Sequence, residues 1–198
     1  MRRLAFDRSG ATAAEFALVL PLLLLLIFGI IDGSRFIWEY NRAEKATQVG
    51  ARVAVVTNAI PSGLAAANYV GVGGLTQGDP IPVSALGTLS CTRTVCTCIG
   101  TGTCPSPGTI NSVDFDRIVT RMQNMKPDIA AANVLVEYRG SGLGYAGDPN
   151  GMEIAPLVTV KLTGLQFTPI TSLLLATITM PAFLTTLTAE DSAGSQSN

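Results

Sequence analysis

Residues 10–31 read GATAAEFALVLPLLLLLIFGII, and this stretch decides how the N-terminal part of the chain folds. From residue 11 to residue 31 it forms about 21 helical residues, or roughly 31 Å, which is enough to cross the hydrocarbon core of a bilayer. Glu15 is its only charged side chain. Since a charge inside a membrane helix costs roughly 2.5 kcal/mol or more, Glu15 must have either a partner or a task.

The flanks of this apolar run predict its orientation. Three arginines and one aspartate precede it, and positively charged flanks stay in the cytoplasm. We therefore expect a single-pass protein of the inner membrane, with a cytoplasmic leader (1–10), a transmembrane helix (11–31) and a C-terminal domain in the periplasm or outside the cell. Removal of the segment by signal peptidase is the alternative, but no small-x-small motif ends the run.

The residues around Gly10 resemble the processing site of type IV prepilins and of their relatives in tight-adherence (Tad or Flp) pilus systems. The likeness is carried by Gly10, four small residues, Glu15-Phe16 and the Leu-rich helix, and it extends over roughly residues 9–55. TadE-like pseudopilins are the members that the chain most resembles. The resemblance implies cleavage after Gly10 by a prepilin peptidase, with Ala11 as the new N-terminus. Many type IV pilins have Phe directly after the cut, so Ala11 there, with the aromatic at Phe16, favours the Tad branch.

The same resemblance implies a structural role, as a minor pilin or pseudopilin. The expected partners are the prepilin peptidase, other pilin or pseudopilin subunits, the pilus assembly platform and the inner membrane. Within that picture Glu15 fixes the register between subunits by meeting the α-ammonium of a neighbour's Ala11. The two charges attract strongly in low dielectric, and each relieves the burial penalty of the other only when they are paired.

The helix is expected to continue past residue 31 into an exported segment, 32–57. Apolar and small residues recur there at alternating spacings of four and three, a narrow stripe suited to packing against a partner surface. The stripe consists of Phe36, Tyr40, Ala43, Thr47, Gly50 and Ala54. The chain from residue 11 to about residue 56 then forms one helix of roughly 46 residues, near 70 Å. The alternative is an ordinary amphipathic helix that caps a soluble domain.

Four cysteines lie within a short Thr- and Gly-rich segment, at Cys91, Cys96, Cys98 and Cys104. Their spacing lacks paired C-x2-C knuckles and the chain has no histidine, so an exported location favours disulfides over zinc. Cys96 and Cys98 are too close to bridge each other. Two pairings therefore stay open, 91–96 with 98–104 or 91–98 with 96–104.

Residues 58–190 are expected to form an exported α+β domain, with an antiparallel sheet and a disulfide knot at 91–104, in a pilin-like arrangement with the long N-terminal helix. A flexible tail, 191–198, follows. The apolar segment 173–187 is interrupted by Thr and Pro, so a buried strand pair is favoured over a second membrane span. The alanines at the centre of 64–70 favour a helical turn or two there, which Gly71 ends. Residue patterns predict a helix at 114–125 and strands at 133–139, 154–167 and 177–189.

Composition argues against several classes of function. A net charge of −1 argues against nucleic acid. Without histidine the usual serine and cysteine triads are unavailable, and no paired carboxylates or Gly-x-Ser-x-Gly elbow are recognisable. We expect no catalytic residue, no metal and no cofactor. The hypotheses are a structural pseudopilin, a membrane-anchored binding module or adhesin without processing, and an anchored Ser-Lys hydrolase that uses Lys45, Lys126 or Lys161.

Overall fold

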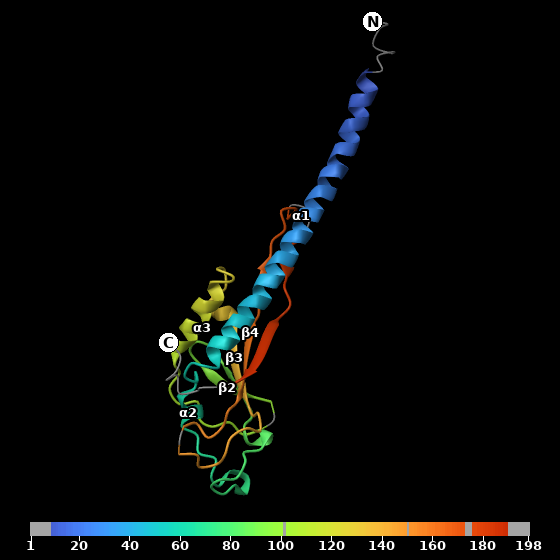
Figure 1. Ribbon diagram of the computed structural model, residues 1–198. Helices are drawn as coiled ribbons and strands as arrows, with labels where there is room; N and C mark the ends of the chain where they lie inside the picture. The colour runs from blue at the N-terminus through green and yellow to red at the C-terminus, as the bar shows by residue number, and fades with distance from the viewer. Residues whose placement is uncertain (1–8, 101, 150, 173–175, 190–198) are drawn as a thin grey trace, which may run out of the picture. The chain divides into compact units, whose positions relative to one another are not determined.

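The computed structural model describes residues 9–100, 102–149, 151–172 and 176–189 (Figure 1). The chain divides into two compact units. The first consists of Met1–Tyr40 and Gln166–Thr179, and the second of Asn41–Leu165 and Met180–Asn198. The predicted tail, 191–198, lies outside the described residues, and so does the predicted leader, 1–10, except for its last two residues. These two residues, Ser9 and Gly10, begin the first helix.

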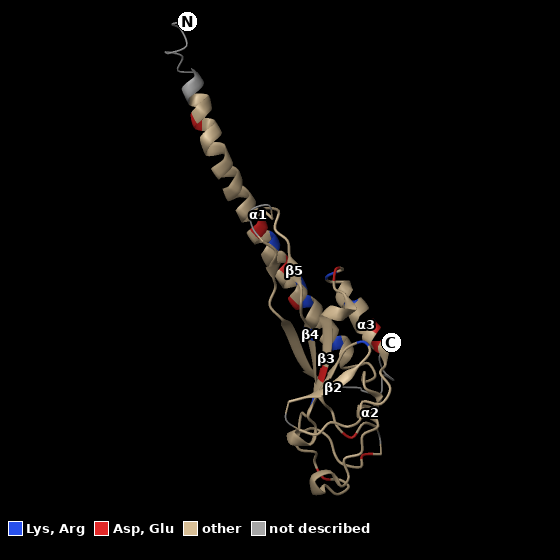
Figure 2. Ribbon diagram, turned by 180° about the vertical axis from the view of Figure 1, so that it is seen from behind, with Lys and Arg blue, Asp and Glu red and all other residues tan. Residues whose placement is uncertain are grey.

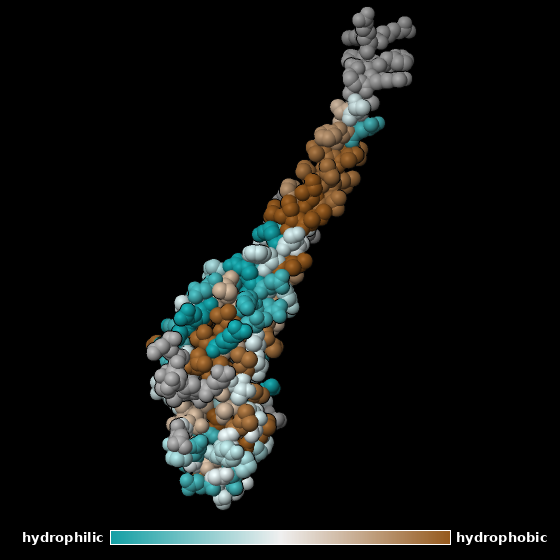
Figure 3. All heavy atoms as spheres, in the orientation of Figure 1, coloured by the Kyte–Doolittle hydropathy of each residue, from teal (hydrophilic) through white to brown (hydrophobic). Residues whose placement is uncertain are grey.

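Helix α1 (Ser9–Ala54) is a single helix of 46 residues with Pro21 inside it. The prediction of one long N-terminal helix is confirmed. Nearly all of its large apolar side chains between Phe16 and Ile31 are exposed, and Figure 3 shows them as a continuous apolar surface. Among the described residues α1 is the one helix long and apolar enough to cross a membrane, and none of its most apolar window is buried.

A small β-ribbon completes the first unit. Strand β5 (Gln166–Phe167) pairs antiparallel with β6 (Ile178–Thr179). We call these two strands and the described residues between them, 168–172 and 176–177, the β5–β6 hairpin. Residues 154–167 had been expected to form one strand, and this is wrong because Gly164, with a φ of +71°, turns the chain after β4. Left-handed φ values favour glycine, so the break follows from the residue type.

The second unit is built on an antiparallel sheet of five strands in the order β2-β1-β3-β4-β7. Alternate residues of β3 are buried, as expected of a strand with one face on a core. The predicted α+β class with an antiparallel sheet is confirmed. The strands are β1 (Thr88–Cys91), β2 (Cys96–Ile99), β3 (Val134–Arg139), β4 (Leu157–Leu162) and β7 (Phe183–Thr188).

Two helices pack against this sheet. In Figure 1, α3 (Ser112–Gln123) and the C-terminal part of α1 lie beside β3 and β4. Helix α3 has a strongly apolar face with Phe115, Ile118 and Met122 buried, and the side chain of Asn111 caps it by accepting the N–H of Asp114 at 3.1 Å. The remaining helices are short: α2 (Ser62–Ala65), η1 (Val72–Gly74), η2 (Val83–Ala85) and η3 (Ala131–Asn133).

The small-residue stripe of α1 packs on the chain's own sheet. Ala43, Thr47 and Ala54 are buried, and Thr185 of β7 donates a hydrogen bond from its hydroxyl to that of Thr47 at 3.1 Å. A Cβ atom on Gly50 would lie 2.8 Å from the Met122 sulfur. The expectation that this part of the stripe serves a partner surface is therefore wrong, because small side chains let the helix approach its own domain closely.

The structure also corrects two expectations about the last part of the chain, the single strand at 177–189 and the buried strand pair within 173–187. The expected strand at 177–189 is interrupted at Met180-Pro181, which separates β6 from β7. The two strands do not form a buried pair, because β6 is exposed and Phe183 is the buried residue of β7. β7 is an edge strand of its sheet, which leaves much of it open. Residues 173–175 of the expected pair lie outside the described part of the chain.

Candidate functional site

The predicted processing segment lies at the start of α1. Gly10 and Ala11 belong to its first turn. Glu15 and Phe16 follow about one turn later, and both are exposed, with 65% of Phe16 accessible. The helix therefore presents the Glu15 carboxylate on its surface, where a group of another molecule can reach it.

The helix carries no charged side chain between Glu15 and Asp32, and Figure 2 shows this stretch without charged positions. Its exposed apolar side chains occur at consecutive positions, so they surround the helix instead of forming one stripe. A helix that is apolar all round needs a protein core or a membrane around it. Since the described part of the chain supplies no core to these residues, their apolar surroundings must come from outside it.

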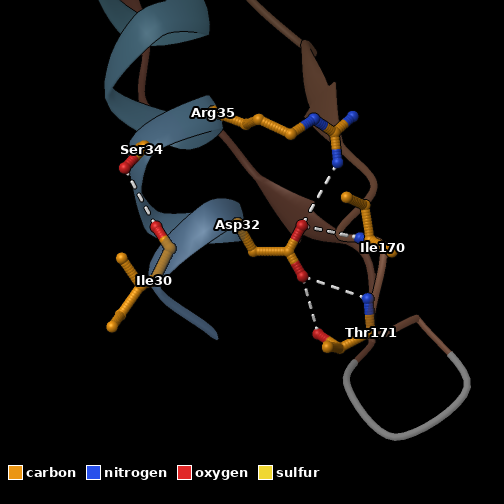
Figure 4. Close-up of polar contacts among 6 residues, drawn as sticks. All are labelled: Ile30, Asp32, Ser34, Arg35, Ile170 and Thr171. Atoms are coloured by element: carbon orange, nitrogen blue, oxygen red, sulfur yellow. Dashed lines mark hydrogen bonds and ion pairs between the residues drawn. The ribbon is translucent and has the colours of Figure 1, made fainter. Parts of the chain in front are cut away.

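Asp32 ends the apolar segment, and it is buried, with 6% of its surface exposed. Its carboxylate accepts the backbone N–H of Ile170 at 2.7 Å on Oδ1 and that of Thr171 at 3.0 Å on Oδ2. The Thr171 hydroxyl donates to Oδ2 at 2.8 Å, and Arg35 Nη1 donates to Oδ1 at 3.2 Å (Figure 4). Four donors thus satisfy one carboxylate and fix the β5–β6 hairpin to the helix.

These contacts also determine the protonation of Asp32. Burial by itself would raise the pKa of its carboxyl, but the hydrogen bonds from Ile170, Thr171 and Arg35 outweigh burial and hold the pKa below its ordinary value. The carboxylate is therefore ionised and fully partnered at neutral pH. A buried charge in this state is a fixed structural element, not a reactive group.

Aromatic side chains continue the same contact along the helix. Phe36 and Phe167 pack edge to face with ring centroids 5.4 Å apart, and Phe36 lies 6.5 Å from Tyr40. The Arg35 guanidinium carbon lies 5.5 Å from the centre of the Phe167 ring. Aromatic pairs of this kind contribute about 0.5 to 1.5 kcal/mol beyond area burial. We call Asp32, Arg35, Phe36, Phe167, Ile170 and Thr171 together the Asp32 anchor.

Sequence reasoning missed the Asp32 anchor. It treated Asp32 only as the boundary of the apolar run. One signal was present, because an acidic residue in mid-helix, directly after a membrane-length segment, needs a partner. The spacing of residues in the sequence could not identify these partners, because Ile170 is 138 residues away from Asp32.

The four cysteines form a separate, local feature of the second unit. Cys91 is bonded to Cys96, its direct cross-strand neighbour in the β1–β2 hairpin. Cys98 is bonded to Cys104, which ties β2 to the following loop. This is one of the two pairings that the sequence leaves open. The hairpin itself was not expected, because its Cys- and Thr-rich sequence lacks the apolar alternation of a strand.

Metal binding has no candidate here: within the part of the chain that the structure describes, no group of three or more Cys, Asp or Glu side chains is placed to hold an ion. The candidate functional site is therefore the helix, with its exposed Glu15, its apolar surface and its Asp32 anchor.

This helix is also where the chain matches a known family. The model of the TadE-like protein family matches residues 10–52. Over these residues the chain is similar to TadE-like proteins. The TadE-like segment includes Glu15, the whole apolar run and Asp32, and it ends within α1. No curated protein and no solved structure matches the chain significantly.

This similarity to the TadE-like family is consistent with a pilin-like protein associated with a Tad pilus. The TadE-like match and the helix coincide over almost their whole length. The domain that follows, with its sheet and disulfides, lies outside the matched residues.

Proposed function

We propose that the chain is a minor pilin or pseudopilin, a structural subunit for assembly of a Tad-type pilus or a related secretion or adhesion apparatus. This proposal rests on the overlap of the family match with one helix. The TadE-like match over residues 10–52 falls on a continuous helix whose first half exposes apolar side chains and a single carboxylate. Subunits that assemble side by side through such helices supply the apolar surroundings that the chain does not supply itself.

The proposed topology places residues 11–31 in the inner membrane and the domain after Asp32 outside the cytoplasm. The basic leader supports this orientation. The two disulfides support it independently, because disulfides persist in oxidising compartments and are rare in the cytoplasm. The prepilin peptidase then reaches the Gly10–Ala11 bond from the cytoplasmic side.

Glu15 is proposed to set the register of the subunit in its assembly. Cleavage after Gly10 creates an α-ammonium on Ala11, about one helical turn before Glu15. Pairing of Glu15 with the ammonium of a neighbouring subunit neutralises both charges in an apolar environment. Because removal of one partner from a buried ion pair is strongly destabilising, the pair fixes the axial stagger of adjacent helices.

The processing step is tested by N-terminal sequencing of the full chain isolated from membranes of a host with a Tad apparatus. We expect Ala11 as the first residue, and Met1 in the same host without its prepilin peptidase. The variant Gly10→Leu should keep Met1, because a bulky residue replaces the small one at the cut. A mature protein that starts at Met1 in the complete host would refute processing.

The register role is tested by co-isolation with other pilus components. Glu15→Ala should insert into the membrane normally but lose co-isolation, because the neighbour's ammonium is left unpaired. Glu44→Ala, which removes an exposed carboxylate from the same helix beyond the apolar run, is the matched control and should co-isolate normally. Normal co-isolation of Glu15→Ala would remove this role while leaving the processing result unaffected.

A further inference from the structure

The β5–β6 hairpin follows α1 back towards its apolar segment. Phe167 contacts the helix at Arg35 and Phe36, whereas Ile170 and Thr171 contact it at Asp32. The hairpin thus moves about 6 Å along the helix axis towards the N-terminus between these contacts. Its loop reaches the helix at the residue that directly follows the apolar run.

The loop presents an apolar side chain at this level. Ile170 is 54% exposed although its backbone N–H is fixed by Asp32, and Figure 4 shows the loop beside the turn that carries Ile30 and Asp32. Ile30 is itself 63% exposed. In Figure 4 the Ile30 side chain lies on the other side of the helix from the loop, so α1 and the loop each present an exposed isoleucine at this level.

The hairpin carries no charged side chain. No charged side chain occurs between Lys161 and Glu190, whereas α1 carries charges at several positions soon after Asp32. The polar residues of the loop are hydroxyl-bearing, among them Thr171 and Ser172. An uncharged loop with an exposed isoleucine and hydroxyl groups suits the boundary between lipid headgroups and acyl chains better than bulk water.

We propose that the β5–β6 hairpin is a second membrane contact, with Ile170 inserted into the surface of the leaflet from which α1 emerges. The Asp32 anchor holds the loop at that depth and satisfies the carboxylate that directly follows the apolar run. Trp38, which is 65% exposed on the same unit, is the aromatic residue expected at such an interface. The inference rests on the membrane anchoring proposed above.

The contact is tested by fluorescence quenching of the full chain in phosphatidylcholine vesicles. Trp38 is the only tryptophan, so Trp38→Phe gives a silent background. Into this background Ile170→Trp, Leu22→Trp and Val113→Trp are introduced separately, all at exposed positions. Lipids brominated in the upper acyl chain should quench Ile170→Trp strongly, lipids brominated near the chain ends should quench Leu22→Trp, and neither should quench Val113→Trp.

The dependence on the anchor gives a second readout. Adding Asp32→Ala should reduce the quenching of Ile170→Trp and leave that of Leu22→Trp unchanged, because the loop is released from the helix but the span is intact. The vesicles carry no net charge, so quenching in them also excludes simple electrostatic adsorption.

The outcomes separate this inference from the proposed function. If Leu22→Trp is quenched but Ile170→Trp behaves like Val113→Trp, the hairpin contact is refuted and the anchoring stands. If Leu22→Trp is also unquenched, both fail. Emission of Ile170→Trp that changes with the protein-to-lipid ratio and not with bromination would show that a second copy covers the loop, which also overturns the proposal.

Discussion

The two halves of helix α1 differ in the size and in the exposure of their apolar side chains. The first half carries large apolar side chains such as Leu18 and Leu22, which stay 72% and 64% exposed. The second half carries small residues such as Ala43 and Ala51, which are completely buried. One half needs surroundings from outside the chain, whereas the other obtains them from its own sheet.

This difference explains how one helix can serve a membrane and a domain. Large side chains increase the apolar area offered to lipid or to neighbouring helices, and each buried methylene contributes about 0.8 kcal/mol. Small side chains allow close approach of the helix backbone to β4 and α3, which gives dense packing with little side-chain entropy to lose. The Asp32 anchor lies between these two stretches of α1.

The comparison is tested most strongly by the same substitution in two environments. Phe115→Ala removes a completely buried ring of the second unit and should lower the free energy of unfolding by about 3 to 5 kcal/mol. Phe16→Ala removes an exposed ring from α1 and should leave that free energy unchanged. Urea unfolding of the full chain in detergent micelles, followed by near-UV circular dichroism, measures both. Equal losses would contradict the assignment of Phe16 to an external environment.

The second pair of variants tests the packing of the helix itself. Gly50→Leu places atoms where Met122 and Val160 already lie, within 2.8 and 3.3 Å of the new Cβ, and should destabilise the domain by up to about 3 kcal/mol. Gly29→Leu on the same helix meets nothing within 4 Å. The same unfolding measurement should show no loss for Gly29→Leu. A neutral Gly50→Leu would mean that α1 does not pack closely on the sheet.

The third test concerns the disulfides, which among the described residues occur in the second unit alone. Replacing Cys98 and Cys104 together by Ser opens a loop with a sequence separation of 6, which should reduce stability by about 2 kcal/mol on the loop-entropy estimate. Membrane insertion of α1, measured by carbonate extraction, should not change. Mass mapping of the unreduced wild type should find no free thiol, and peptides linked as 91–98 would contradict the observed pairing.

The smallest effect is expected at the Asp32 anchor. Because the pKa of Asp32 is lowered on folding, the anchor is complete above the ordinary value of 3.8 and is lost as the pH falls through the lowered pKa. Hydrogen-exchange protection of the Ile170 and Thr171 amides should fall there, while amides of the central strand β3 stay protected. In Asp32→Asn, protection at the two amides should be weak at all pH values. A pH-independent wild type would contradict the charge-based anchor.

The first half of α1 was predictable because its signals are local. The length of the apolar run, the single Glu15 and the basic flank are all properties of contiguous residues. Strand β3 was also predicted nearly to its ends, since Val134, Val136 and Tyr138 alternate clearly. In these segments, propensity and burial favour the same structure.

Other elements were mispredicted where local and long-range preferences differ. The expected strand at 154–167 ignored the turn at Gly164, and the β1–β2 hairpin was hidden by its Cys- and Thr-rich composition. The hairpin is held by pairing with β3 and by its disulfide, not by an apolar pattern of its own. Contacts of this kind are not encoded in any short window.

By itself the sequence determined that a long helix begins near residue 10, that the first half of this helix is apolar apart from one carboxylate, and that the cysteines pair locally. Only the tertiary structure decided that the small residues after Tyr40 pack on the chain's own sheet and that Asp32 holds the distant residues Ile170 and Thr171. The reason is physical. Hydrophobic length and charge act through neighbouring residues, whereas the partner of a buried group depends on how the whole chain packs.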